Sequence, residues 1–184
     1  MAKATYEYPA DIAFRDAARA AMDSGFRKMM KNASGTRSGA ERREATAEEV
    51  EALHDMRVGS RRLRAALAVF ANVFPKADFQ EMDKEVGAIT DALGAVRDLD
   101  VQLDALRALQ SAAPPNEAYG ISRLVERQTE QREIERKALL VALERLDKSR
   151  FERRFQKALD RALPPGPAAA KAPESDVSEE VTHG

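Results

Sequence analysis

Apolar residues recur at helical spacing through most of this 184-residue chain, which places them on one face of an α-helix. The clearest example lies between residues 86 and 106, where the apolar stripe consists of Val86, Ile89, Leu93, Val96, Leu103 and Leu106. No stretch has the alternating pattern typical of a β-strand, and Ala, Leu, Glu and Arg, which favour helices, are abundant. The sequence therefore predicts an all-α protein.

Helix boundaries follow from the same period and from local stop signals. Four long helices and a short fifth are predicted at residues 9–30, 47–74, 78–111, 117–147 and 151–159. Thr46 and Glu49 have the spacing of a capping box, and Pro75 ends the second helix. The polar, glycine-containing stretch 34–44 is predicted to be a flexible connection. Long helices with short connections fit an antiparallel four-helix bundle.

Composition sets the domain organisation. Residues 1–163 are expected to form one bundle, and residues 164–184, rich in Pro and Ala and then acidic, a disordered tail. That tail holds one lysine and four acids, so the bundle is near +2 although the chain is −1. The absence of cysteine excludes disulfides and thiolate chemistry. With no run near the roughly 20 apolar residues that span a bilayer, and no signal-peptide pattern, we expect a cytoplasmic protein without a membrane partner.

Positive charge is concentrated on one face of the second predicted helix. At about 100° per residue, His54, Arg57, Arg61 and Arg64 fall within roughly a quarter of its circumference, whereas Arg62 points elsewhere. This row adjoins the apolar face of the helix. Such an arrangement is costly unless an anion or carboxylates neutralise it, so the row is a candidate anion site.

Charges also interrupt the apolar stripes of the next two helices. Asp100 falls on the stripe of residues 86–106, with Arg97 at its edge, and Arg132 interrupts the stripe of helix 117–147 with Arg136 one turn on. The candidate site therefore comprises a set of basic residues and two supporting carboxylates: His54, Arg57, Arg61, Arg64, Arg97, Arg132 and Arg136, with Asp98 and Asp100. Surface charges, or a bridge from Arg132 to Asp100 or Glu135 that fixes helix register, remain alternatives.

His54 has several possible roles. A metal ligand is implausible, because the other histidine, His183, lies in the predicted tail and the chain has no cysteine. As a catalytic base it lacks a recognisable nucleophile partner. A hydrogen-bonded packing residue and a donor to a bound anion both remain open. No catalytic residue, metal site or cofactor is predicted.

Two motifs resemble those of the CHAD family, the conserved-histidine α-helical domains. The first motif is a histidine, an arginine three residues later and then a run that contains paired arginines. In this chain it consists of His54, Arg57, Arg61, Arg62 and Arg64. A leucine–glycine to arginine–aspartate segment appears at residues 93–101. The resemblance spans about residues 12–163 and implies non-catalytic binding of inorganic polyphosphate in a basic groove. Family members are commonly longer, with paired bundles and a second motif, so this chain is similar to a half-length form.

The missing half and the charge pattern leave several hypotheses open. A homodimer would restore a double bundle by two-fold pairing. A phosphoanhydride-processing role is weaker, because no glycine loop for phosphates is present. An interaction or scaffold bundle would have its basic cluster paired internally by Asp98, Asp100, Asp104 and Glu135. Nucleic acid is an unlikely partner, because the basic face has few aromatic residues for base stacking.

Overall fold

The computed structural model describes residues 13–42 and 44–164, which form helices joined by short connections, and no β-strand occurs among them. The elements are α1 (Phe14–Lys31), α2 (Ala33–Glu41), α3 (Ala47–Val69), the 3₁₀ turn η1 (Ala71–Val73), α4 (Lys76–Ala112), α5 (Pro115–Lys148) and α6 (Phe151–Ala162). The all-α prediction is confirmed. The predicted start of the first helix at residue 9 and residues 165–184 of the predicted tail lie outside the described residues.

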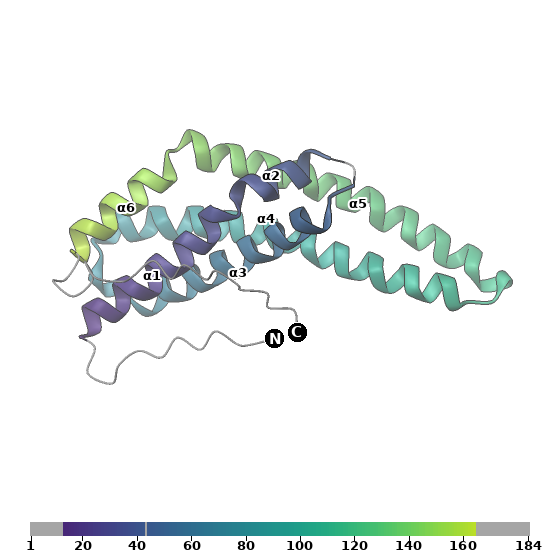
Figure 1. Cartoon of the computed structure of the whole chain (residues 1–184), viewed down its shortest axis with the longest axis horizontal. Helices are drawn as coiled ribbons and strands as arrows, with labels where there is room; N and C mark the ends of the chain where they lie inside the picture. The colour runs from purple at the N-terminus through teal and green to yellow at the C-terminus, as the bar shows by residue number, and fades with distance from the viewer. Residues whose placement is uncertain (1–12, 43, 165–184) are drawn as a thin grey trace, which may run out of the picture.

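α4 and α5 form a long antiparallel hairpin, and its closed end extends beyond the other helices (Figure 1). α3 packs along α4, α1 packs along α3, and α2 contacts both α3 and α5. Five of the six apolar residues of the 86–106 stripe are buried, and only Leu106 is half-exposed. The core is not confined to this hairpin, because α1, α3 and α6 also contribute buried apolar side chains.

The prediction of a flexible connection at residues 34–44 is wrong, because most of this stretch forms α2. Its glycines pack against α3. A Cβ added at Gly35 would lie 2.8 Å from the Cβ of Ala52, and one at Gly39 would lie 2.9 Å from the Cβ of Glu49. Thr36 is buried between them, and its hydroxyl donates to the carbonyl of Asn32 at 2.8 Å. Glycine here permits close packing and does not break the helix.

Close approach also defines the crossing of α1 and α3. A Cβ at Gly25 would lie 2.7 Å from the backbone nitrogen of Leu63, and one at Gly59 would lie 2.5 Å from that of Met29. Side chains are therefore excluded at both positions, and the two helices meet through their backbones. This contact fixes where α3, and with it the arginine row, lies against the rest of the fold.

The predicted capping box at the start of α3 is confirmed. The backbone nitrogen of Glu49 donates to the Thr46 hydroxyl at 3.3 Å, and that of Thr46 donates to the Glu49 carboxylate at 2.8 Å. The same carboxylate accepts from the Ser38 hydroxyl at 2.6 Å, which joins α2 to α3. The Ser38 hydrogen bond, followed by the Thr46 backbone, holds the pKa of Glu49 below its usual value.

The predicted short last helix is confirmed as α6, which packs back towards α1 (Figure 1). Arg150, between α5 and α6, has left-handed backbone angles (φ 53°, ψ 43°) that turn the chain abruptly. The ring of Phe155 then stacks on that of Phe26 with centroids 4.4 Å apart, and Phe151 lies beside both. These rings anchor α6 to α1.

Candidate anion-binding site

Three of the predicted site arginines line one open cavity of about 530 Å³ between α3 and α4. We call it the α3–α4 groove. α3 contributes Arg57, Arg61 and Arg64, which share one face because they are four and three residues apart. The main polar residues from α4 are Thr90, Asp91 and Asp98. Arg62 does not line the groove, in agreement with the face predicted from the helical period.

The groove arginines are only weakly neutralised. Arg57 pairs with Asp98 at 3.4 Å and Arg64 pairs with Asp91 at 3.1 Å, but the two carboxylates are 64% and 74% exposed. Exposed pairs of this kind contribute at most about 1 kcal/mol. Arg61 is exposed, and its side chain has no hydrogen-bond or ion-pair partner within residues 13–42 and 44–164. One guanidinium of the groove is therefore free among the described residues, and the other two pair only with exposed carboxylates.

Glycines of α4 lie under the arginine side chains. A Cβ at Gly87 would lie 3.8 Å from Cζ of Arg64, and one at Gly94 would lie 3.9 Å from Nε of Arg57. These are ordinary contacts, and no backbone of α3 lies within 4 Å of either position. The two glycines therefore do not mark a close helix approach. They leave room for the arginine side chains to lie across α4.

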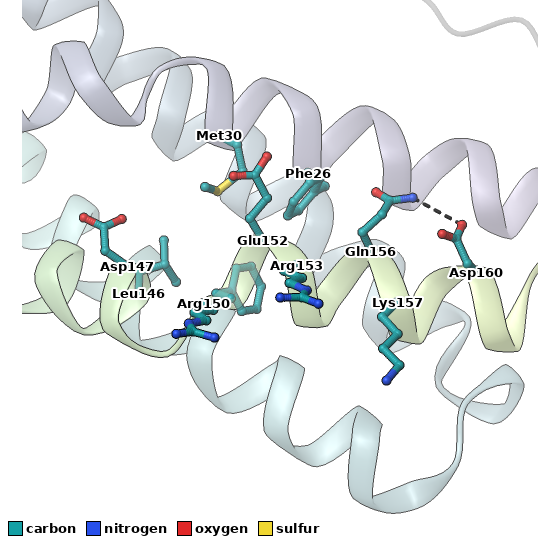
Figure 2. A pocket seen from close by; sticks show the side chains of 11 residues that line it. Phe26, Met30, Leu146, Asp147, Arg150, Glu152, Arg153, Gln156, Lys157 and Asp160 are labelled. Atoms are coloured by element: carbon teal, nitrogen blue, oxygen red, sulfur yellow. Dashed lines mark hydrogen bonds between the residues drawn. The ribbon is translucent and has the colours of Figure 1, made fainter.

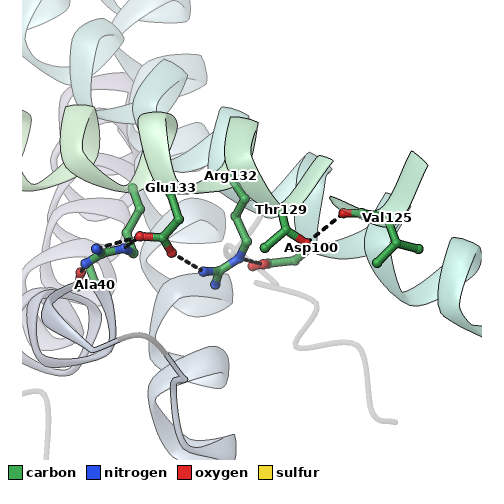
Figure 3. A network of polar contacts seen from close by, with 7 residues as sticks. Ala40, Asp100, Val125, Thr129, Arg132 and Glu133 are labelled. Atoms are coloured by element: carbon green, nitrogen blue, oxygen red, sulfur yellow. Dashed lines mark hydrogen bonds and ion pairs between the residues drawn. The ribbon is translucent and has the colours of Figure 1, made fainter. Parts of the chain in front are cut away.

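Two other predicted residues, Arg97 and Arg132, line a separate cavity of about 520 Å³ among α4, α5 and the start of α3. Nε of Arg132 donates to the Asp100 carboxylate at 2.5 Å, and the two side chains are only 18% and 16% exposed (Figure 3). Glu135 instead accepts from Gln131. Arg132 therefore pairs with Asp100 and not with Glu135, and this pair connects α5 to α4.

Arg136 lies outside both cavities. One of its terminal nitrogens donates to the backbone carbonyl of Ala40, near the C-terminal end of α2. Its Nε and its other terminal nitrogen donate to Glu133 at 3.0 and 2.8 Å (Figure 3). The hydrogen bond from Arg136 is also the main reason that the pKa of Glu133 lies below its usual value. Arg136 therefore connects α2 to α5.

His54 lines neither cavity and is half-buried on α3. It stands one turn from Arg57, which faces the α3–α4 groove, and one turn from Val50, which lines the second cavity. Its ring has no hydrogen-bond partner in the described part of the chain. The structure thus places His54 between the two cavities and leaves its ring nitrogens available.

The sequence prediction did not include Asp91 and Thr90 of the groove, nor Arg107 of the second cavity. Asp91 could have been found, because it precedes Asp98 by seven residues and so lies on the same face of α4. Arg107 has the same signal, because it follows Asp100 by seven residues and so lies on the same face of α4. It lines the second cavity beside the start of α3.

A family model described as the CHAD domain matches residues 13–182. The match covers nearly the whole chain, and the chain belongs to the CHAD family. CHAD domains are associated in general with polyphosphate binding and are generally binding domains without catalytic activity. No curated protein and no solved structure gives a significant match. In the described part of the chain, every helix is too short or too polar to cross a membrane.

Proposed function

We propose that this protein binds inorganic polyphosphate in the α3–α4 groove without catalysing a reaction on it. The observation that supports this most is that the groove arginines are only weakly paired with carboxylates. Arg57, Arg61 and Arg64 face one cavity, and the carboxylates beside them are exposed and weakly paired. A linear polyanion can occupy such a groove by replacing these carboxylates.

The chemistry of the residues suits this ligand. Polyphosphate has no bases or sugars, so its recognition depends on charge and on hydrogen bonds to phosphate oxygens. Arginine offers paired donors in a planar fork and keeps its charge at every physiological pH. Hydrogen bonds to charged groups contribute about 1.5–3 kcal/mol each, so three arginines can bind firmly together.

The second cavity extends the proposed site along the chain of phosphates. His54 stands between the two cavities, and Arg97 has no side-chain partner among the described residues. A polyanion that leaves the groove past His54 would therefore reach Arg97, with Arg132 beyond it. In this proposal Asp100 holds Arg132 in place, and Arg136 acts through the position of α5. Asp98 orients Arg57 until the polyanion replaces it.

An interaction or scaffold protein is the second candidate. The pairs Arg57–Asp98, Arg64–Asp91 and Arg132–Asp100 favour it, because they neutralise part of the basic cluster internally. Arg61 and Arg97 remain without partners in the described ranges, which this candidate does not explain.

Titration of the full chain with long-chain polyphosphate at increasing salt separates the two candidates. Polyphosphate binding predicts tight association at low salt, with an affinity that falls steeply because each phosphate contact releases counterions. No association at low salt would favour the scaffold. Incubation with polyphosphate and Mg²⁺ should leave the length of the polymer unchanged, and shortening would contradict a non-catalytic role.

We also infer that the protein forms a symmetric homodimer. Ile134 and Val141, seven residues apart on α5, are large apolar side chains exposed on one face, with exposed Ala138 between them. A two-fold axis would bring this face against its own copy. Sedimentation should show a dimer at micromolar concentration, and Ile134→Glu should shift it towards monomer. A wild-type protein that sediments as a monomer would contradict the inference.

A further inference from the structure

A second surface with unpaired positive charge lies outside both cavities of the proposed site. A cavity of about 790 Å³ runs between α1 and α6 (Figure 2), and we call it the α1–α6 groove. Its apolar floor includes Phe26, Met30 and Leu146. Basic side chains of α6 line the cavity as well, and the proposed polyphosphate site uses none of them.

Three cations line this groove: Arg150, Arg153 and Lys157. Arg153 and Lys157 are four residues apart and share one face of α6, and Arg150 lies directly before this helix. Figure 2 shows the three cations along one side of the helix, with Glu152 and Gln156 along the other. All three are exposed. None of them has a side-chain hydrogen bond or ion pair within the residues that the structure describes.

The carboxylates at the groove do not neutralise these cations. Asp147 accepts from Arg37 of α2. Asp160 accepts from Arg19 of α1 at 2.6 Å, and from Gln156 at 3.3 Å. Glu152 is the one carboxylate lining the groove that has no partner among the described residues. Three free cations therefore face a single free carboxylate, so the groove attracts an acidic ligand.

The chain itself contains a segment of matching chemistry. Residues 174–181, beyond the described part, read Glu-Ser-Asp-Val-Ser-Glu-Glu-Val. Four carboxylates suit the three cations, and the two valines suit an apolar floor. We propose that segment 174–181 binds in the α1–α6 groove of its own chain. This inference does not depend on polyphosphate binding.

The length of the connection fits this proposal. α6 has 12 residues and is therefore about 18 Å long, which sets the distance back to Arg150. Residues 165–173 lead from its C-terminal end to the acidic segment, and nine residues span about 16 Å as a random coil or about 28 Å as a polyproline helix. The required distance lies between these values. A linker matched to the span gives an effective concentration in the millimolar range, so weak ionic contacts suffice.

The experiment uses the absence of cysteine from the chain. Two spin labels are attached to the full-length protein at introduced cysteines. One is Arg27→Cys, an exposed position on α1, and the other is Thr182→Cys, directly after the acidic segment. We expect a short, narrow distance distribution at low salt, which broadens as salt screens the charges. Arg153→Gln with Lys157→Gln should broaden it in the same way, as should replacement of the four acids by Gln.

A matched control removes two charges elsewhere. Arg123 and Arg127 are exposed on α5 and have no partner among the described residues, so Arg123→Gln with Arg127→Gln should leave the distribution narrow. Broadening in this control would assign the effect to net charge and overturn the proposal. A distribution that is broad in the unsubstituted background would also overturn it. So would a distance from Thr182→Cys to Ala68→Cys that is shorter than the one to Arg27→Cys, because Ala68 lines the α3–α4 groove.

Discussion

Arginines that look alike in the sequence are held in different ways. Arg61 is exposed and unpaired in the described residues, whereas Arg132 is largely buried against Asp100. Arg136 donates to a helix carbonyl and to Glu133. The helical period predicted which side chains share a face, but it contains no information on their partners. The sequence was enough to predict that Arg132 needs a carboxylate partner. The role of Arg136 could not be predicted, because it depends on where α2 lies.

The Asp100–Arg132 pair should stabilise the fold. Asp100→Ala leaves a guanidinium that is only 18% exposed with no carboxylate closer than Glu133 at 3.9 Å, and we expect a loss of about 2 kcal/mol in the free energy of unfolding. Urea denaturation measures this loss. Asp104→Ala is the matched control, because Asp104 is 75% exposed and lies 4.0 Å from Arg107, so its removal should cost at most about 0.5 kcal/mol. Equal effects would contradict a structural role for the pair.

At the scale of elements, periodicity and capping signals predicted the long helices, and the structure agrees with the start of α3 at its capping box. The same rules failed for α2. Gly35 and Gly39 indicated a loop, but in the structure they allow α2 to pack closely against α3. A sequence does not distinguish a glycine that breaks a helix from one that lets two helices touch, because the neighbouring helix decides which it is.

Replacing a glycine by alanine should therefore raise the stability of the fold at some positions and lower it at others. Gly59→Ala places a Cβ 2.5 Å from the backbone of Met29, so it should destabilise the protein by about 2–3 kcal/mol. Gly120→Ala meets no atom within 4 Å, and the gain in helix propensity should stabilise α5 by up to about 1 kcal/mol. Thermal unfolding of both variants tests this. Stabilisation by Gly59→Ala would contradict the backbone contact between α1 and α3.

The link between α2 and α3 should depend on pH through Glu49. The pKa of this carboxyl is lowered in the folded protein, chiefly by the Ser38 hydroxyl, from a value near 4.5. Its contribution to stability is therefore complete above that value and is lost as the pH falls through the lower, folded pKa. Unfolding free energies measured from neutral pH into this acidic range should fall less in Glu49→Gln than in the wild type. Glu48→Gln, an exposed neighbour without a side-chain partner among the described residues, should keep the wild-type pH dependence.

At the scale of the whole molecule, the predicted site divides into two cavities along α4. Arg57, Arg61 and Arg64 line the first, while Arg97 and Arg132 line the second. The sequence predicted both groups but placed them around one pocket. The division depends on how far α4 and α5 extend beyond α3 (Figure 1), and no local pattern specifies this.

The central claim concerns the α3–α4 groove, and two adjacent residues test it most directly. Arg61 and Arg62 are both exposed and unpaired in the described residues, but only Arg61 lines the groove. The measurement is the affinity for long-chain polyphosphate as a function of salt. We predict that Arg61→Ala weakens binding by about tenfold and lowers the salt slope by about one, while Arg62→Ala changes both much less. Equal losses in the two variants would contradict the account.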